Sequence, residues 1–179
     1  MKFDIEGNPD FGQLTVGLEP GDSLLAESGS MAFMSDGTEL QSKLIGGFAK
    51  ALIRKVVGGE SLFVGEYSHP FGGSVTFSPD RPGMVLHRKI SGETFVLTAG
   101  SFLACTPGIK LNTKFVSLGA IFSGEGAFTI EVSGEGDLFF NSYGAIIEKK
   151  VDGALTVDSG HAVAWESGLK YNVTTIGGV

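Results

Sequence analysis

Three histidines and two glutamates are the residues whose types could support catalysis or metal binding. His69, His87 and His161 are far apart in the sequence, and no two of them show the His-x-His or His-x-x-x-His spacing of a local metal site. Glu27 and Glu166 occupy equivalent positions in two similar glycine-bounded segments, so a symmetric carboxylate pair could perform acid–base chemistry. A hydrogen-bonding role in turns explains both glutamates better, because the third such segment has a threonine at that position.

Other catalytic motifs are absent from the sequence or weak. The chain contains neither a Gly-x-Ser-x-Gly elbow nor a P-loop, and its Gly-Glu-Gly stretches at 124–126 and 134–136 are typical of turns. We therefore predict no catalytic residue, no metal site and no cofactor, and a protein that is not an enzyme. A small-ligand-binding or metal-dependent β-barrel enzyme is an alternative, because folding could bring distant residues together.

A basic and apolar stretch is the candidate interaction surface. Residues 46–59 read GGFAKALIRKVVGG, and the spacing predicts one short amphipathic helix near 42–57, with Ser42 as its N-cap and the glycine pair at 58–59 as its end. At 100° per residue the apolar and basic side chains fall on opposite sides of this helix. The apolar side holds Leu44, Phe48 and Leu52, and the basic side holds Lys43, Lys50 and Arg54.

Three interpretations of this helix remain open. It could be a connector packed on the β core, with its basic side in solvent or paired with acidic neighbours. It could be covered from two sides, by its own sheet and by a neighbouring subunit, because its apolar arc is wider than a one-sided surface helix needs. It could also bind an anionic membrane surface, where basic residues beside an apolar face add attraction.

Two short patterns recur three times and indicate the elements that must position these residues. A glycine, seven residues and a second glycine form the segments 21–29, 100–108 and 160–168. Each has an apolar centre, which predicts a short buried strand between turns. A Phe-x-x-Glu pattern in a β-prone run starts at Phe3, Phe63 and Phe128. These coincidences predict a single β-repeat domain, 1–179, with units near 3–58, 63–120 and 128–179.

The glycine content and the residue alternation favour an all-β fold. The chain has 28 glycines without a Gly-X-Y period, as expected for many tight turns between short strands. Residues 74–78 and 169–174 alternate between polar and apolar, and 84–89 and 145–150 are also rich in strand formers. We predict an all-β protein, a double-stranded β-helix or sandwich, with an internal three-fold repeat and one short helix.

In combination these motifs resemble a family of uncharacterised proteins named for altered inheritance of mitochondria. The resemblance rests on the stretches FDIEGNP at 3–9, LAESGSM at 25–31, GESLF at 59–63 and AWES at 164–167, and it spans essentially the whole chain. The bacterial members resemble the tryptophan RNA-binding attenuation protein in fold. The resemblance implies a double-stranded β-helix and a ring-like oligomer, often a trimer, and it transfers no catalytic residue.

Charge and cysteine content indicate the compartment and exclude some partners. With a formal net charge of −7 and a pI of about 4.9, the chain would repel phosphate backbones, so we do not expect it to bind nucleic acid. Cys105 is the only cysteine and is predicted to be a small buried side chain, which fits a reducing compartment. The only tryptophan, Trp165, is predicted to lie in the core or an interface. The N-terminus shows no apolar signal core, so we expect a cytoplasmic protein.

These observations predict a non-enzymatic binding or scaffold protein that self-associates, with a trimer favoured. The alternative is a peripheral membrane-associated protein that uses the basic helix near 42–57.

Overall fold

A computed structural model describes residues 1–44, 63–115 and 128–172, and all three ranges form β-strands joined by turns. The strands are β1 (Lys2–Glu6), β2 (Gln13–Leu18), β3 (Ser23–Glu27), β4 (Met31–Met34), β5 (Glu39–Leu44), β6 (Phe63–Ser68), β7 (Gly73–Phe77), β8 (Val85–Ser91), β9 (Phe95–Thr98), β10 (Phe102–Cys105), β11 (Ile109–Phe115), β12 (Phe128–Asn141) and β13 (Ala164–Glu166). Two short 3₁₀-helices, η1 (Ala99–Ser101) and η2 (Ser159–His161), complete the described elements. The prediction of an all-β protein is confirmed.

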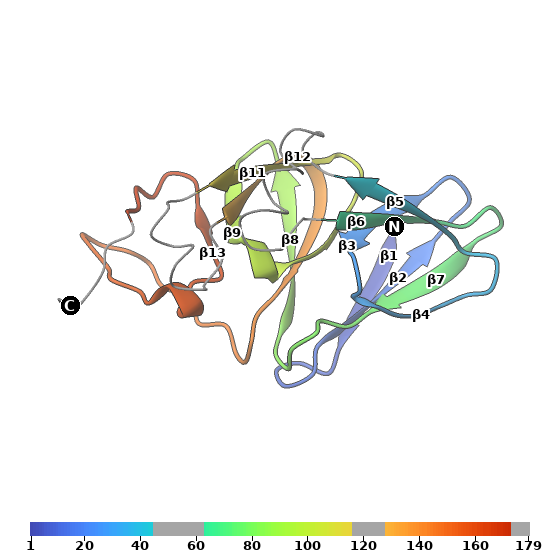
Figure 1. The fold of residues 1–179 in the computed structure, drawn as a ribbon, viewed down its shortest axis with the longest axis horizontal. Helices are drawn as coiled ribbons and strands as arrows, with labels where there is room; N and C mark the ends of the chain where they lie inside the picture. The colour runs from blue at the N-terminus through green and yellow to red at the C-terminus, as the bar shows by residue number, and fades with distance from the viewer. Residues whose placement is uncertain (45–62, 116–127, 173–179) are drawn as a thin grey trace.

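The strands pair antiparallel in two sheets. A four-stranded sheet has the order β1-β2-β7-β4, and a nine-stranded sheet has the order β13-β9-β12-β10-β3-β6-β5, with β8 and β11 also paired to β12. Figure 1 shows β1, β2, β4 and β7 at one end of an elongated molecule and β13 toward the other end. The double-stranded β-helix and the three-fold repeat, with the unit bounds given above, stay predictions.

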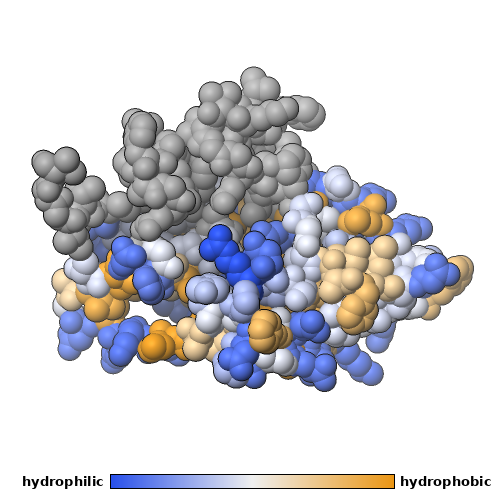
Figure 2. Space-filling view, turned by 60° about the horizontal axis from the view of Figure 1, so that its bottom comes forward, coloured by the Kyte–Doolittle hydropathy of each residue, from blue (hydrophilic) through white to orange (hydrophobic). Residues whose placement is uncertain are grey.

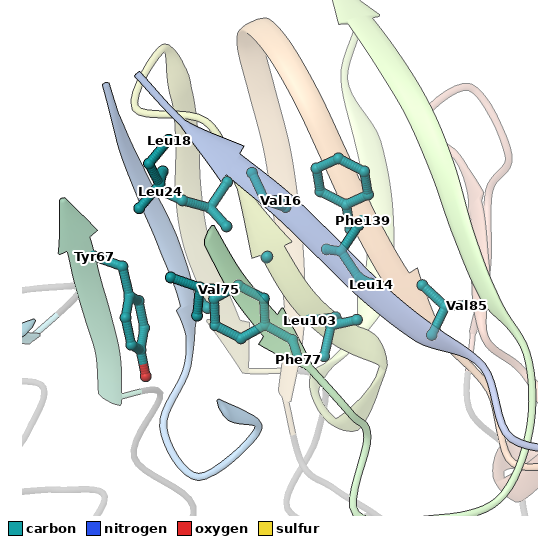
Figure 3. Packing of buried hydrophobic residues seen from close by; sticks show 12 residues of the cluster. Leu14, Val16, Leu18, Leu24, Tyr67, Val75, Phe77, Val85, Leu103 and Phe139 are labelled. Carbon is teal, nitrogen blue, oxygen red and sulfur yellow. The ribbon is translucent and has the colours of Figure 1, made fainter. Parts of the chain in front are cut away.

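One hydrophobic core lies between the four-stranded sheet and the nearby strands of the larger sheet. β2 alternates between inward apolar and outward residues, so Leu14, Val16 and Leu18 are buried, and Val75 and Phe77 of β7 join them. Figure 3 shows these side chains meeting those of the nine-stranded sheet, which contributes Leu24, Tyr67, Val85, Leu103 and Phe139. The two sheets therefore pack face to face through this core.

β12 is long because a glycine pair lets it change partners. Its first half pairs with β9 and β11, and its second half pairs with β8 and β10. Gly134 (φ +100°) and Gly136 (φ +153°) lie at the change of partners, where a Cβ on Gly134 would stand 2.3 Å from the carbonyl oxygen of Gly108. The prediction of a turn at 134–136 is wrong, because the glycines bend a continuous strand rather than end it. The stretch 124–126 lies outside the described residues.

The predicted start of the amphipathic helix is also wrong. Ser42, Lys43 and Leu44 belong to β5, which pairs with β6 from Glu39↔Ser68 to Leu44↔Phe63. The ladder satisfies the backbone groups of these residues non-locally, and a helical pattern in the sequence does not reveal that partner. Phe48, Lys50, Leu52 and Arg54 lie outside the described residues, so the rest of the helix stays a prediction.

The other sequence patterns have mixed outcomes. Each of the three glycine-bounded segments contains a short strand, namely β3, β10 and β13, and the Phe-x-x-Glu runs lie on β1, β6 and β12. The strands expected near 74–78 and 84–89 are confirmed as β7 and β8. Residues 145–150 and 169–172 form no strand, although their sequences favour one. The last two residues of the 169–174 pattern lie outside the described residues.

Candidate functional site

Of the predicted interaction surface, the structure describes only Lys43 and Leu44, and both lie on strand β5. Lys43 lies on β5 and its ammonium group forms an ion pair with Glu66 of β6, which also accepts a hydrogen bond of 3.2 Å from the Ser23 hydroxyl. The hydrogen bond from Lys43 holds the pKa of Glu66 below its ordinary value, against the smaller opposing effect of burial. Leu44 is the last residue of β5, beside Phe63 of β6. Lys43 is thus engaged within the sheet.

A shallow polar depression of about 300 Å³ lies beside this ion pair. It is lined by Gly21, Asp22, Ser23, Glu39, Glu66, Ser68, His69 and Pro70. Three carboxylates share this depression, so its character is acidic. Asp22 accepts a hydrogen bond of 3.1 Å from the Glu19 backbone N–H, and Glu66 is paired with Lys43, so two of the three are already held by the fold.

His69 is a buried residue of the loop between β6 and β7. It follows β6 and is 7% exposed, and its Nδ1 accepts the Phe71 backbone N–H at 3.1 Å. Nε2 therefore carries the ring proton and donates to the Asp36 carbonyl at 2.9 Å. The ring leaves no room for a Cβ on Gly73, which would stand 2.6 Å from its Cδ2. His69 ties the β4–β5 turn to the β6–β7 turn.

His87 belongs to a polar and aromatic cluster that the sequence did not reveal. Its Nε2 donates to Asp137 of β12 at 2.8 Å, and Lys89 contacts the same carboxylate at 3.2 Å. Burial alone would raise the pKa of Asp137, but the hydrogen bonds from His87 and Lys89 hold it below its ordinary value. The imidazole packs against Phe3 and Phe139, with ring centroids 4.5 and 5.2 Å away.

The His87 cluster fits a structural role. An imidazole oriented by a carboxylate resembles the base of many hydrolases. Here the ring is held against two phenylalanines, and Phe3 brings β1 onto the nine-stranded sheet through its 4.9 Å contact with Phe139. The cluster therefore fastens β1 to β8 and β12. The only sequence signal for this cluster was the alternation of His87 and Lys89 on β8. Asp137, which both side chains contact, lies 48 residues beyond Lys89.

The remaining candidates do not come together. Glu27 ends β3 and Glu166 ends β13. Three strands lie between β3 and β13 in the nine-stranded sheet, so the carboxylate pair considered from the sequence does not form. Glu166 instead accepts a hydrogen bond of 2.7 Å from Arg88. His161 ends η2, and its Nδ1 lies 3.3 Å from the Asp158 carboxylate. Among the described residues, no group of three or more His, Cys, Asp or Glu side chains could hold a metal ion.

Cys105 matches its predicted buried setting, whereas Trp165 lies on an edge strand and is not one of the buried core residues. Cys105 is fully buried on β10, and burial raises the pKa of its thiol to about 12. Trp165, on β13, is partly buried, and its ring meets that of Tyr171 edge-on at 5.0 Å. Its Nε1 is buried, and it has no hydrogen-bond partner among the residues that the structure describes. A buried indole N–H normally finds an acceptor, so this edge of the sheet leaves a polar group unsatisfied within the described part of the chain.

Exposed apolar side chains gather in two places. Figure 2 shows hydrophobic surface toward the end that carries the C-terminal region, here residues 142–172, and a second group toward the opposite end. The exposed large apolar residues of the C-terminal region are Tyr143, Ile147, Leu155, Val157, Leu169 and Tyr171. Those of β4 and β5 are Phe33, Met34 and Leu40.

A second, more apolar depression of about 440 Å³ lies where three loops meet. Its lining includes Phe11 and Tyr143, which are 69% and 77% exposed. Gly83 joins these loops through isolated bridges to Phe11 and Gly144. The side chain of Asn8 accepts a hydrogen bond from the Val85 N–H and donates one to its carbonyl, at 2.9 and 2.8 Å. The backbone of the depression is therefore tied down by the fold.

A model of the family described as mitochondrial biogenesis AIM24 matches residues 3–179. The chain belongs to the AIM24 family. The resemblance stated from the sequence motifs is thereby confirmed. This AIM24 chain is 30% identical over 182 residues to an uncharacterised protein of Streptococcus pyogenes serotype M6, a match that covers 97% of this chain and 73% of that protein.

A solved structure agrees with the fold of this AIM24 chain. The crystal structure of another protein from Streptococcus pyogenes superposes with a TM-score of 0.76 at 29% sequence identity, covering 93% of this chain and 76% of that one. No helix of the described residues is long and apolar enough to cross a membrane.

Proposed function

We propose that this protein is a non-enzymatic binding or scaffold protein that self-associates, with three copies as the favoured assembly. The single observation that supports self-association is the exposed apolar surface of the C-terminal region, residues 142–172, where most strand-forming sequence is unpaired among the described residues. The family resemblance favours three copies.

The C-terminal region is rich in strand-forming sequence but poor in strands. Residues 145–151 read AIIEKKV and residues 154–157 read ALTV, and neither stretch pairs with any described strand. Only the three residues of β13 join a sheet, where they pair with β9. Figure 1 shows this part of the chain running as loops at the end of the molecule opposite β4 and β7.

Apolar side chains of these loops are left in solvent. Ile147 is 76% exposed, Leu155 54% and Val157 49%. Single exposed apolar residues are ordinary on a protein surface, but several within one short region mark a site that another chain covers. A second copy is the simplest cover, because closed symmetric homo-oligomers are the commonest assemblies of soluble proteins.

The peripheral membrane alternative has less support. It rests on a basic helix near 42–57, and Lys43, one of the four basic residues in that segment, is ion-paired with Glu66 on a strand. The alternative of an enzyme or small-ligand binder rests on distant residues meeting, and the glutamate pair considered for that role is separated by three strands. We therefore propose neither.

Sedimentation of variants tests the proposal. Leu155→Lys and Ile147→Lys place charge in the proposed contact and are expected to lower the sedimentation coefficient to that of a single chain. Leu155→Ile keeps the apolar side chain and is the matched control, expected to sediment as the wild type does. Both positions are exposed, so circular dichroism should show the same β signal in all three variants. A wild-type protein that sediments as one chain at every concentration would contradict self-association.

A further inference from the structure

The two edges of the four-stranded sheet differ in how they are protected. β1, at one edge, carries Lys2, Asp4 and Glu6 at alternate positions, which is a common way to keep other strands from pairing there. β4, at the other edge, reads MAFM and has no charge and no proline. Among the described strands β4 pairs only with β7, so the outer edge of its backbone is unpaired in the part of the chain that the structure describes.

Apolar side chains line this edge and the neighbouring edge strand β5. Met34 pairs in register with Val75 and Leu40 pairs with Tyr67, and both partners belong to the core between the sheets. Directly opposed residues on antiparallel strands point to the same face, so Met34 and Leu40 extend the core to the margin of each sheet. They remain 39% and 48% exposed, and Phe33, on the other face of β4, is 63% exposed.

The turn between β4 and β5 is held by several hydrogen bonds. The Ser35 N–H donates to the Ser74 carbonyl at 2.8 Å, and the Thr38 hydroxyl donates to the Ser35 carbonyl at 2.7 Å. His69 donates to the Asp36 carbonyl from the β6–β7 turn. The exposed side chains of Asp36 and Glu39 are thus carried by a preformed backbone. We call Phe33, Met34, Leu40, Asp36 and Glu39 the β4–β5 margin.

The net negative charge of the chain lies in its N-terminal part, and Asp36 and Glu39 place two of these charges on the margin. Residues 1–42 contain eight acidic residues and one basic residue, a net charge of −7. Residues 43–179 contain twelve of each and are neutral, so residues 1–42 carry the net charge of the whole chain. A symmetric pairing of two β4 edges would bring two such acidic regions together, and the same repulsion opposes nucleic acid or an acidic peptide. The complementary partner is basic.

We propose that the β4–β5 margin docks a basic, strand-forming segment of another protein. The unpaired edge of β4 supplies backbone hydrogen bonds to the added strand, as in other cases of strand addition. Met34 and Leu40 receive its apolar side chains, and methionine adapts readily to different partners. Asp36 and Glu39 receive its lysine or arginine side chains. This surface lies at the end of the molecule opposite the C-terminal region and does not depend on self-association.

Fluorescence anisotropy with a labelled ten-residue peptide of alternating lysine and valine tests the proposal on the full chain. The Asp36→Lys/Glu39→Lys variant is expected to weaken binding by about tenfold or more, as expected for loss of charge-assisted contacts. Leu40→Ser is expected to weaken binding as well. The matched control is Asp4→Lys/Glu6→Lys on β1, which changes the net charge by the same amount and should leave binding within about twofold of wild type.

Three outcomes would overturn the proposal. If the Asp4→Lys/Glu6→Lys control on β1 weakened peptide binding as much as the margin variant does, the binding would be diffuse attraction to an acidic protein. Equal binding of a glutamate–valine peptide would remove the requirement for a basic partner. A drop in the mass of the protein's own assembly in the Asp36→Lys/Glu39→Lys variant would assign the margin to a second copy of the chain.

Discussion

Lys43 of β5 and Glu66 of β6 form an ion pair across two neighbouring strands. In register Lys43 stands opposite Val64 and Glu66 stands opposite Gln41, so the two charges meet diagonally across the ladder. The pair shows that the residues expected to begin a basic helix instead complete the edge of the nine-stranded sheet. A lysine assigned to a surface for partners or lipid is thus engaged by its own fold.

Replacing Lys43 should change the titration of Glu66 more than the stability of the protein. In Lys43→Met the pKa of Glu66 is expected to rise toward its ordinary value, because the donor that lowers it is gone. The loss of stability should be below about 1 kcal/mol, since Lys43 is half exposed. A carboxyl group with a lowered folded pKa stabilises above its unfolded pKa and loses that contribution as pH falls through the folded value. NMR titration of the Glu66 carboxyl measures the shift, and an ordinary wild-type pKa would contradict the ion pair.

His69 should be a neutral ring with its proton on Nε2. Both nitrogens are hydrogen-bonded to backbone groups, one as donor and one as acceptor. ¹⁵N chemical shifts of the ring distinguish the two tautomers directly. His69→Ala is expected to cost about 2–4 kcal/mol, because it removes two bonds and leaves a cavity. His161→Ala is the control, and should change stability by less than about 0.5 kcal/mol because its side chain is 82% exposed. An Nδ1–H tautomer would show that the assigned hydrogen bonds are incorrect.

Gly134 should not tolerate a side chain. Gly134→Ala combines a positive φ with a clash against the Gly108 carbonyl, and is expected to cost more than about 2 kcal/mol in denaturant unfolding. Gly100→Ala is the matched control, because a Cβ there meets no atom within 4 Å. It should change stability by less than about 1 kcal/mol. Similar costs at the two positions would argue against a glycine-dependent bend in β12.

Cys105 should resist thiol reagents until the protein unfolds. Its side chain is fully buried, and a pKa of about 12 leaves almost no thiolate at neutral pH. Its raised folded pKa also predicts that stability falls as pH rises above the unfolded value of about 8.5, because only the unfolded chain releases the proton. Cys105→Ala should remove that contribution to the alkaline slope. Rapid labelling of the native protein at pH 8 would mean that the β10 region opens readily.

Local patterns in the sequence predicted much of the sheet structure. The alternation at 74–78 predicted β7, and the apolar centres of the glycine-bounded segments predicted β3, β10 and β13. β3 buries one face and β10 is buried throughout, whereas β13 is only partly buried, so the prediction of a buried strand fails there. The burial of Cys105 followed from its apolar neighbours in the same way.

The features that failed depend on contacts between distant residues. The pattern near Ser42 favours a helix, but in the structure this stretch pairs with β6. The glycines at 134 and 136 are typical of a turn, but four strands, β8, β9, β10 and β11, pair with β12 along its length. The pairing of His87 with Asp137 joins residues fifty positions apart, and no spacing rule in one sequence detects it. The segment 145–150 has strand-forming residues, but it lacks a neighbouring strand in the described chain.

The solution mass of the wild-type chain, measured by light scattering across a range of concentrations, tests self-association most directly. The proposal predicts a mass near three times 18.7 kDa, with the C-terminal region at the contact between copies. A mass of 18.7 kDa at every concentration would contradict it and would leave the exposed side chains of Ile147, Leu155 and Val157 without the cover proposed for them.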